Sequence, residues 1–291
     1  MKLVIAATNA VAIPTIETLK REHSLTLVTM PDSYAGRGKA LKSSEIANAF
    51  PNVLKPNDEV QLAEILHGHD LLITIGYGRI LSESILSIPK LGGINLHFSL
   101  LPHWRGAAPV QRCIESGESL TGVTVFQMDK GMDTGPIWSQ FEYQITESET
   151  SATLFNALAR IGASAVKVAL EKIQNGDIPE PQIGNPTYAN KVQKNECIIN
   201  WNSPAEVIIR KIRAFSYNPG VLTTFRGKIL KVEEAESSAA HLPAGVLDSE
   251  GKVGTATSAI QLLSVVPSGK RRMAVKDWLN GLKPEPGERF E

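Results

Sequence analysis

The sequence predicts an α/β protein with two domains, a larger one built on a mostly parallel sheet and a smaller β-barrel. Three observations support this prediction. Apolar runs of strand length alternate with amphipathic helical segments through the first half of the 291 residues. A proline-rich segment follows at residues 177–190, and beyond it short strand signals are separated by turns. The alternation favours a parallel sheet covered on both faces, and the closely spaced short strands favour a barrel.

The larger domain contains five apolar runs of strand length, at residues 3–7, 25–30, 71–75, 93–97 and 122–128. Helical patterns fall between them, at residues 13–22, 58–66, 82–87 and 109–116. In a Rossmann-like sheet of this kind, ligands bind beyond the carboxyl ends of the strands. His97 and the loop after Met128 stand at such ends. We therefore expect the chemistry there.

A long helical pattern covers residues 150–175, with an apolar stripe that includes Leu154, Leu158 and Val166. Gly176 is suited to the left-handed position that ends a helix. The prolines and glycine that follow favour an extended connection. We assign residues 1–182 to the larger domain and residues 183–203 to a linker.

The last part, residues 204–291, predicts a small OB-like barrel. Ser203 and Pro204 resemble the start of a helix that runs to about residue 214. A short helix is also predicted at residues 275–279. Five short strands are predicted, at residues 221–225, 228–232, 245–248, 252–256 and 260–266.

Composition indicates an ordinary soluble protein, with 42% apolar residues, 21% charged residues and a net charge of zero. No apolar run reaches the length of a membrane span, so we expect no membrane partner and a cytoplasmic location. Two cysteines form neither a disulfide framework nor a metal spacing. From residue 183 onward there are 15 Lys and Arg against 11 Asp and Glu, and before it 15 against 19. The modestly basic second part indicates either a polyanionic partner or an ordinary charged surface.

Three polar residues near strand ends could form an acyl-transfer site. Asn95 and His97 share one face of a predicted strand, and Asp133 lies in a glycine-rich turn after the next one. An Asn amide can donate to an oxyanion, and a His beside a carboxylate can donate or relay a proton. Alternatively, Asn95 and His97 are satisfied within the strand and Asp133 caps its turn.

Nucleophilic and metal chemistry are less well supported. Ser99 follows His97, but the strand-to-helix elbow of a nucleophilic serine is absent. Cys113 falls in a predicted helix among apolar residues, as a buried cysteine does. His67 and His69 flank a glycine beside Asp70, without a third ligand at a convincing spacing. We therefore expect no metal.

Basic residues gather in a glycine-rich loop and in the C-terminal part, where they could follow a nucleic-acid backbone or simply be solvated. The residues that we expect to contact nucleic acid are Arg37, Lys39, Lys42, Lys191, Arg213, Lys270, Arg271 and Arg272.

Taken together, these motifs resemble the folate-dependent formyltransferases. The match is carried by Asn95-Leu96-His97, by the loop from Ser99 to Gly106, and by the turn from Gly131 to Gly135. Within that superfamily the chain is similar, over essentially its whole length, to the methionyl-tRNA formyltransferases. The features that select this branch are Arg105 to Gln111, Pro31 to Lys39, Tyr188 to Lys191, Trp201, Ile212 to Phe215 and Gly269 to Met273.

The resemblance implies transfer of a formyl group from 10-formyltetrahydrofolate to the methionine of initiator methionyl-tRNA, in support of translation initiation. It implies that Asn95, His97 and Asp133 are catalytic, that Asp133 orients His97, and that neither metal nor acyl-enzyme is needed. It assigns to folate binding Tyr77, Gly78, Arg79, Ile80, Leu81, Ser99, Leu100, Leu101, Pro102, Gln127, Met128, Asp129 and Lys130. We expect a monomer.

Other functions remain open on the sequence. A sugar N-formyltransferase or a formyltetrahydrofolate hydrolase would use the same three residues. A tRNA-binding module without catalysis would keep only the basic surface. The sequence also departs from the family pattern at residues 7–9, which replace a Gly-Thr-Pro turn, and at His103, where a basic residue is usual.

Overall fold

A computed structural model of the chain describes residues 1–35, 40–216 and 219–291. Arg37 and Lys39 of the predicted basic loop lie outside these described residues. The chain divides into two compact units. The first unit comprises Met1–Pro109, Leu120–Gln144 and Phe155–Ala189, and the second comprises Val110–Ser119, Ile145–Leu154 and Asn190–Glu291.

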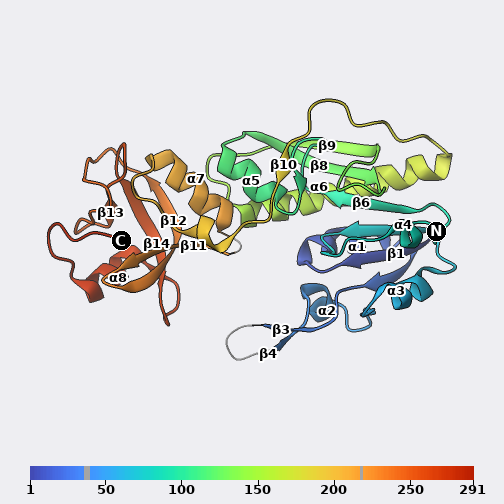
Figure 1. The fold of residues 1–291 in the computed structure, drawn as a ribbon, viewed down its shortest axis with the longest axis horizontal. Coiled ribbons are helices and arrows are strands. Elements are labelled where there is room, and N and C mark those ends of the chain that lie inside the picture. The colour runs from blue at the N-terminus through green and yellow to red at the C-terminus, as the bar shows by residue number, and fades with distance from the viewer. Residues whose placement is uncertain (36–39, 217–218) are drawn as a thin grey trace. The chain divides into compact units, whose positions relative to one another are not determined.

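The first unit is built on a six-stranded mixed sheet (Figure 1). In spatial order its strands are β2 (Ser24–Val28), β1 (Lys2–Ala7), β5 (Leu71–Ile75), β6 (Gly93–His97), β8 (Leu120–Gln127) and β9 (Ile137–Gln144). The first four are parallel, and β8 and β9 continue the sheet antiparallel. The predicted Rossmann-like, mostly parallel sheet is therefore confirmed. β9 was not predicted, because its outer half alternates exposed and half-buried residues instead of forming an apolar run.

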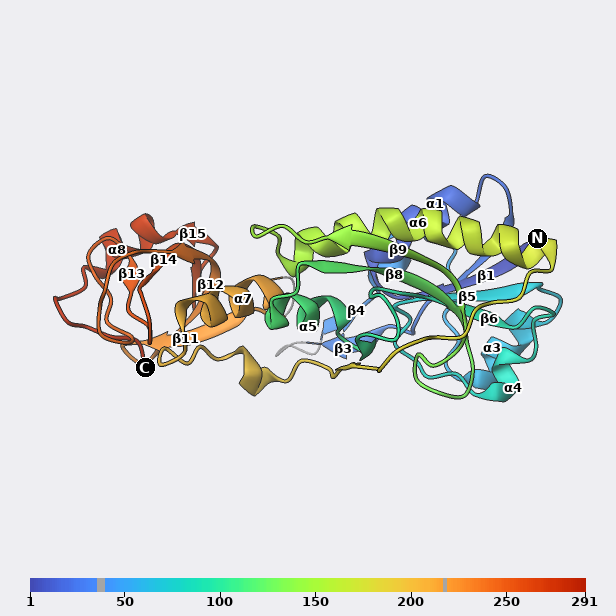
Figure 2. The ribbon, with the colours of Figure 1, turned by 90° about the horizontal axis from the view of Figure 1, so that it is seen from above.

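Helices cover both faces of this sheet, with α1 and α6 on one face and α3 and α4 on the other (Figure 2). The first unit contains α1 (Ile13–Leu19), α2 (Glu45–Ala49), α3 (Glu59–Leu66), α4 (Glu83–Leu86) and most of α6 (Ser151–Asn175), with a 3-10 turn at Ala10–Ala12. Helix α5 (Pro109–Ser116) belongs almost entirely to the second unit. Asp58 caps α3 by accepting from the backbone N–H of Gln61. The apolar residues of α3 and α4 pack with β1 and β5 in one core cluster.

Helix α6 packs closely on the strand that carries the predicted site. A Cβ on Gly162 of α6 would lie 2.6 Å from a terminal methyl group of Leu96 of β6, so a larger residue would require that side chain to move. Among the described residues, α6 alone is long and apolar enough to cross a bilayer by length and composition, and half of its most apolar window is buried inside the protein. A core helix passes the same test, and the buried stripe of Leu154, Leu158 and Val166 fits that explanation.

Two small sheets of the first unit were not predicted. Strands β3 (Ser33–Ala35) and β4 (Ala40–Lys42) form an antiparallel hairpin. Strands β7 (Arg105–Gly106) and β10 (Tyr188–Ala189) pair in parallel, which attaches the proline-rich segment to the loop after β6. Pairs of two or three residues have no periodicity that a sequence could display.

The second unit contains a curled antiparallel half-barrel, as the OB-like prediction required. Its strands are β11 (Val221–Phe225), β12 (Lys228–Ser237), β14 (Ile260–Pro267) and β13 (Lys252–Val253), with β15 (Met273–Ala274) on β14. Helices α7 (Ala205–Phe215) and α8 (Val275–Leu282) and a 3-10 turn at Lys194–Cys197 complete it. The predicted strand at residues 245–248 is wrong, because only isolated bridges form there. Close backbone packing of Gly254 on Leu242 and Pro243 replaces a regular ladder.

Candidate active site

Two polar side chains of β6 lie at the carboxyl end of that strand. Asn95 and His97 are two residues apart and therefore point to the same face of the sheet. On the neighbouring strand, Thr74 pairs with Asn95 in the parallel register. The Thr74 hydroxyl donates to Oδ1 of Asn95 over 2.7 Å. Because the carbonyl end of the amide is engaged in this way, Nδ2 is the end of Asn95 that can donate to a ligand.

The His97 ring is almost completely buried, and one of its nitrogens has a fixed role. Nε2 lies 2.9 Å from the carbonyl oxygen of Trp104. A carbonyl only accepts, so Nε2 carries the proton and donates it. Nδ1 faces Asp133, 3.7 Å from its Oδ2. At 3.7 Å this contact is too long for a hydrogen bond, so the short hydrogen bond of the ring is the one that Nε2–H donates to the Trp104 carbonyl.

Asp133 is held in the turn after β8 with a left-handed backbone, at a φ of 55°. Its Oδ2 accepts the backbone N–H of Gly106 over 2.7 Å. The turn itself is capped by another residue, since Asp129 Oδ1 accepts from the Gly131 N–H and the Thr134 hydroxyl. Asp133 is thus not the turn-capping residue of the alternative interpretation, and its carboxylate is directed to the loop after β6.

Gln182 joins that turn to the loop after β6, and sequence reasoning did not find it. Its Nε2 donates to the carbonyl oxygens of Asp133 and Gly135, at 2.9 and 2.8 Å. Its Oε1 accepts from Nε and Nη2 of Arg105, at 3.2 and 2.7 Å. Both ends of the Gln182 amide are therefore engaged. This one side chain restrains the turn that carries Asp133 and the loop that carries Arg105. A glutamine in a proline-rich segment carries no local signal of this role.

The three predicted catalytic residues line one cavity of about 380 Å³ at the carboxyl ends of β5 and β6. Such a volume is within the range of small-molecule sites. Apolar side chains of Leu81, Phe126 and Met128 contribute to its wall, and Asn95, His97 and Asp133 contribute polar groups. An apolar wall with a few directed polar groups fits a planar heteroaromatic ring such as a pterin.

Eight of the predicted folate-binding residues line this cavity. They are Tyr77, Gly78, Arg79, Ile80, Leu81, Met128, Asp129 and Lys130. The Tyr77 side chain is 3% exposed within the core, where burial raises the pKa of its phenol. The backbone carbonyl of Tyr77 accepts from the Thr8 hydroxyl.

The other five predicted folate-binding residues do not line the cavity. They are Ser99, Leu100, Leu101, Pro102 and Gln127. Ser99 donates to the carbonyl of His103, and Leu101 N–H donates to the Thr124 hydroxyl. Gln127 Nε2 donates to Gly93, and its Oε1 accepts from Trp138. These polar groups of Ser99, Leu101 and Gln127 are thus engaged within the protein.

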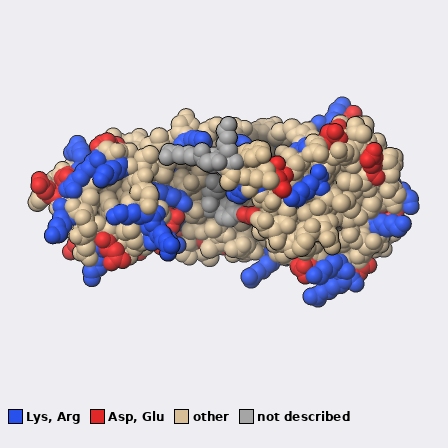
Figure 3. Space-filling model, turned by 90° about the horizontal axis from the view of Figure 1, so that it is seen from below, with Lys and Arg blue, Asp and Glu red and all other residues tan. Residues whose placement is uncertain are grey.

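The predicted nucleic-acid contacts differ in how accessible they are. Lys42, Lys191, Lys270, Arg271 and Arg272 are exposed. Arg213 donates to the backbone carbonyls of Thr146 and Glu147, and burial lowers the pKa of its guanidinium. Arg272 pairs with Glu233 and Glu234, the latter at 2.6 Å. Blue Lys and Arg side chains are more frequent than red Asp and Glu on the face of the second unit shown in Figure 3.

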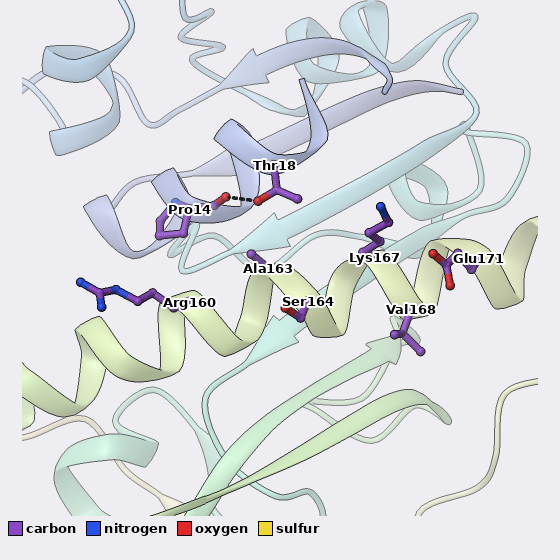
Figure 4. A pocket seen from close by; sticks show the side chains of 8 residues that line it. All are labelled: Pro14, Thr18, Arg160, Ala163, Ser164, Lys167, Val168 and Glu171. Atoms are coloured by element: carbon purple, nitrogen blue, oxygen red, sulfur yellow. Dashed lines mark hydrogen bonds between the residues drawn. The ribbon is translucent and has the colours of Figure 1, made fainter. Parts of the chain in front are cut away.

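A second hollow of about 410 Å³ lies between α1 and α6 (Figure 4). Its charged lining residues are Arg160, Lys167 and Glu171, spread along α6 without converging on one point (Figure 4). Lys167 is paired with Glu22. Within residues 1–35, 40–216 and 219–291, no group of three or more His, Cys, Asp or Glu side chains could hold a metal ion.

Comparison with known proteins identifies the family of this chain. The formyl transferase family model matches residues 1–170, and the model of the formyl transferase C-terminal domain matches residues 191–283. The methionyl-tRNA formyltransferase of Thermobifida fusca is 38% identical over 307 residues, which cover 100% of this chain and 99% of the relative. That of Aromatoleum aromaticum is 37% identical over 281 residues, which cover 91% of this chain and 88% of the relative.

Solved structures share the fold at lower identity. The methionyl-tRNA formyltransferase of Clostridium thermocellum aligns with a TM-score of 0.63 at 18% identity, covering 82% of this chain and 94% of that one. HypX of Aquifex aeolicus, in complex with tetrahydrofolic acid, aligns with a TM-score of 0.72 at 18% identity. The match covers 99% of this chain and 48% of HypX. By its family models and its full-length relatives, this chain belongs to the methionyl-tRNA formyltransferase family.

Proposed function

We propose that this enzyme transfers the formyl group of 10-formyltetrahydrofolate to the amino group of methionine on initiator methionyl-tRNA. The observation that carries the proposal is the meeting of Asn95, His97 and Asp133 in one cavity at the carboxyl ends of parallel strands. The choice of donor and acceptor rests on family membership, since the relatives that align over most or all of their length are named methionyl-tRNA formyltransferases.

Asn95 stabilises the negative charge that develops when an amine attacks a formyl carbon. The carbonyl oxygen gains charge during the attack, and a fixed amide donor stabilises it more than water does. Nδ2 of Asn95 suits this role because Oδ1 is held by Thr74. No covalent acyl-enzyme is part of the proposal, since Ser99 donates to a backbone carbonyl and Cys113 is buried.

His97, which lies beside Asp133, takes part in proton transfer during the reaction. The amine must lose one proton as the new carbon–nitrogen bond forms, and the departing nitrogen must gain one. Because Nε2–H is committed to Trp104, Nδ1 is the nitrogen of His97 that can take a proton. Oδ2 of the Asp133 carboxylate lies 3.7 Å from that nitrogen.

The folate, when bound, supplies the formyl group, and the cavity residues from Tyr77 to Leu81 and from Met128 to Lys130 would hold its ring. We propose no metal. The division into a catalytic domain of residues 1–182, a linker of residues 183–203 and a tRNA-binding domain of residues 204–291 also belongs to the proposal. We also propose that the chain is a monomer, that it is cytoplasmic and that it has no membrane partner.

Exposed basic residues are proposed to contact the tRNA backbone. They are Lys42, Lys191, Lys270 and Arg271. Arg37 and Lys39 remain part of the proposal from the sequence. Arg213 and Arg272 also remain part of it, although each already donates to other groups of the chain. Such contacts would add affinity through release of counterions.

A transfer assay tests the proposal. Purified full-length protein is incubated with 10-formyltetrahydrofolate and one of three acceptors: methionyl initiator tRNA, a nucleotide-linked amino sugar, or water alone. We expect formyl-methionyl-tRNA to accumulate, with negligible formylation of the sugar and negligible hydrolysis. Sugar formylation without tRNA formylation would instead make the chain a sugar N-formyltransferase. Release of formate at the same rate with and without tRNA would identify a hydrolase.

A further inference from the structure

Thr74 is a buried polar residue directly beside the proposed oxyanion donor. It is 4% exposed and stands opposite Asn95 in the register of β5 and β6. Both side chains line the same cavity. The O–H···O distance of 2.7 Å between the Thr74 hydroxyl and Asn95 Oδ1 is that of a good hydrogen bond. The hydroxyl therefore contacts one specific end of the amide.

An asparagine side chain can present either of two opposite ends to a ligand. If the amide turned over, Oδ1 would face the cavity and repel an oxygen that gains negative charge. The orientation in the structure avoids this, because the Thr74 proton is donated to Oδ1. Two other acceptors contact the hydroxyl: the carbonyl of Ile94 at 3.5 Å and the sulfur of Met128 at 3.3 Å. A long contact and a thioether are weaker acceptors than an amide oxygen at 2.7 Å.

We infer that Thr74 is a positioning residue, which holds the Asn95 amide with Nδ2 directed into the cavity. The inference rests on the proposed oxyanion role of Asn95. Removing the hydroxyl alone leaves Oδ1 of Asn95 without this donor, so the amide becomes free to turn. Transition-state stabilisation then falls while the cavity keeps its shape, because valine has nearly the volume of threonine. Thr74 acts through Asn95 and not on the substrate.

The test compares Thr74→Val with the matched variant Thr74→Ser, which keeps the hydroxyl. For Thr74→Val we expect kcat for formyl transfer to fall about tenfold, the effect of losing one hydrogen bond of ordinary strength. The KM for 10-formyltetrahydrofolate should stay within about twofold, because the hydroxyl supports a contact made mainly in the transition state. Thr74→Ser should restore most of kcat. Thermal unfolding of each variant verifies that the protein is folded.

A double-mutant comparison separates positioning from a general structural role. Asn95→Ala and the pair Thr74→Val with Asn95→Ala should have the same kcat, since there is no amide left to orient. The inference is overturned if Thr74→Val keeps full kcat, if Thr74→Ser is as impaired as Thr74→Val, or if the two substitutions are additive. A different result, full kcat in Asn95→Ala, would reject the proposed role of Asn95 itself. Absence of formyl transfer in the wild-type protein would reject the proposed function.

Discussion

Gly106 donates its backbone N–H to the carboxylate of Asp133 over 2.7 Å, although the two residues are 27 positions apart. The same glycine has a φ of 122° and pairs with Ala189 in the short sheet of β7 and β10. A Cβ at this position would lie 2.8 Å from the carbonyl oxygen of Ala189. The backbone that directs Asp133 toward His97 thus depends on a residue without a side chain.

Gly106→Ala should therefore lower both stability and activity. The added methyl group must push β7 away from β10, and the N–H donor to Asp133 moves with it. We expect a loss of unfolding free energy of about 2 kcal/mol or more, because strain and a steric clash combine. Gly68→Ala is the control, since Gly68 also has a positive φ but nothing lies within 4 Å of its Cβ. Equal losses in the two variants would contradict the role of close packing at Gly106.

Gln182→Glu should lower kcat while keeping the contact to Arg105. A carboxylate still accepts from the guanidinium but cannot donate to the carbonyls of Asp133 and Gly135. We expect kcat to fall about tenfold or more, because loosening of the turn misplaces Asp133. Gln182→Ala, which loses both sets of bonds, should fall further. Steady-state kinetics measures kcat of both variants. If both match or exceed the wild-type kcat, the turn keeps its geometry without Gln182.

Asn95→Asp should be nearly inactive although it preserves the shape of the side chain. It replaces the proposed Nδ2 donor by an oxygen and adds a negative charge where charge is expected to develop. We expect a loss in kcat of about a hundredfold or more. Binding of tetrahydrofolate, measured by calorimetry, should change much less than kcat. A variant that loses folate binding but keeps kcat would place Asn95 in binding and not in catalysis.

Protonation of Glu196 should make the second unit less stable in acid. Both of its carboxylate oxygens accept from Nη2 of Arg112 at 3.0 Å, and this hydrogen bond lowers the pKa of Glu196 from its ordinary value of 4.5. A depressed folded-state pKa stabilises the folded protein above the unfolded pKa, and the contribution is lost as pH falls through the folded value. Melting temperatures should therefore decline below about pH 4.5. Glu196→Gln should melt lower at neutral pH and decline less steeply in acid; parallel curves would refute this.

Lys270 and Arg271 should contribute more to tRNA affinity than Arg272. All three side chains are exposed, but Arg272 already pairs with Glu233 and Glu234. Neutralising both Lys270 and Arg271 should weaken binding and reduce the slope of log K against log salt by about one for each phosphate that is no longer neutralised. Arg272→Gln is the matched control, with little change in slope. Filter-binding titrations at several salt concentrations decide between these outcomes, and identical slopes in all variants would exclude this surface from the tRNA path.

Much of the first unit was predictable because its central strands are buried on both faces. Strands β1 and β5 have almost no exposed residues, so they appear in the sequence as continuous apolar runs. Strand β9 and the hairpin of β3 and β4 are partly exposed or very short, and their pattern resembles that of a loop. In the second unit, β12 extends through Ser237 although its last residues are mostly exposed, since pairing with β14 stabilises them.

The sequence by itself determined the family and the three polar residues of the site, because Asn95, His97 and Asp133 belong to compact motifs within 39 residues of chain. Only the tertiary structure decided how each of them is held. Asn95 is engaged by Thr74, His97 by the carbonyl of Trp104, and Asp133 by Gly106, with Gln182 restraining its turn. The physical reason is that a side chain's orientation depends on hydrogen-bond partners brought close by sheet register and loop pairing. Partners such as Thr74 and Gln182 are ordinary polar residues far along the chain, and nothing local marks them.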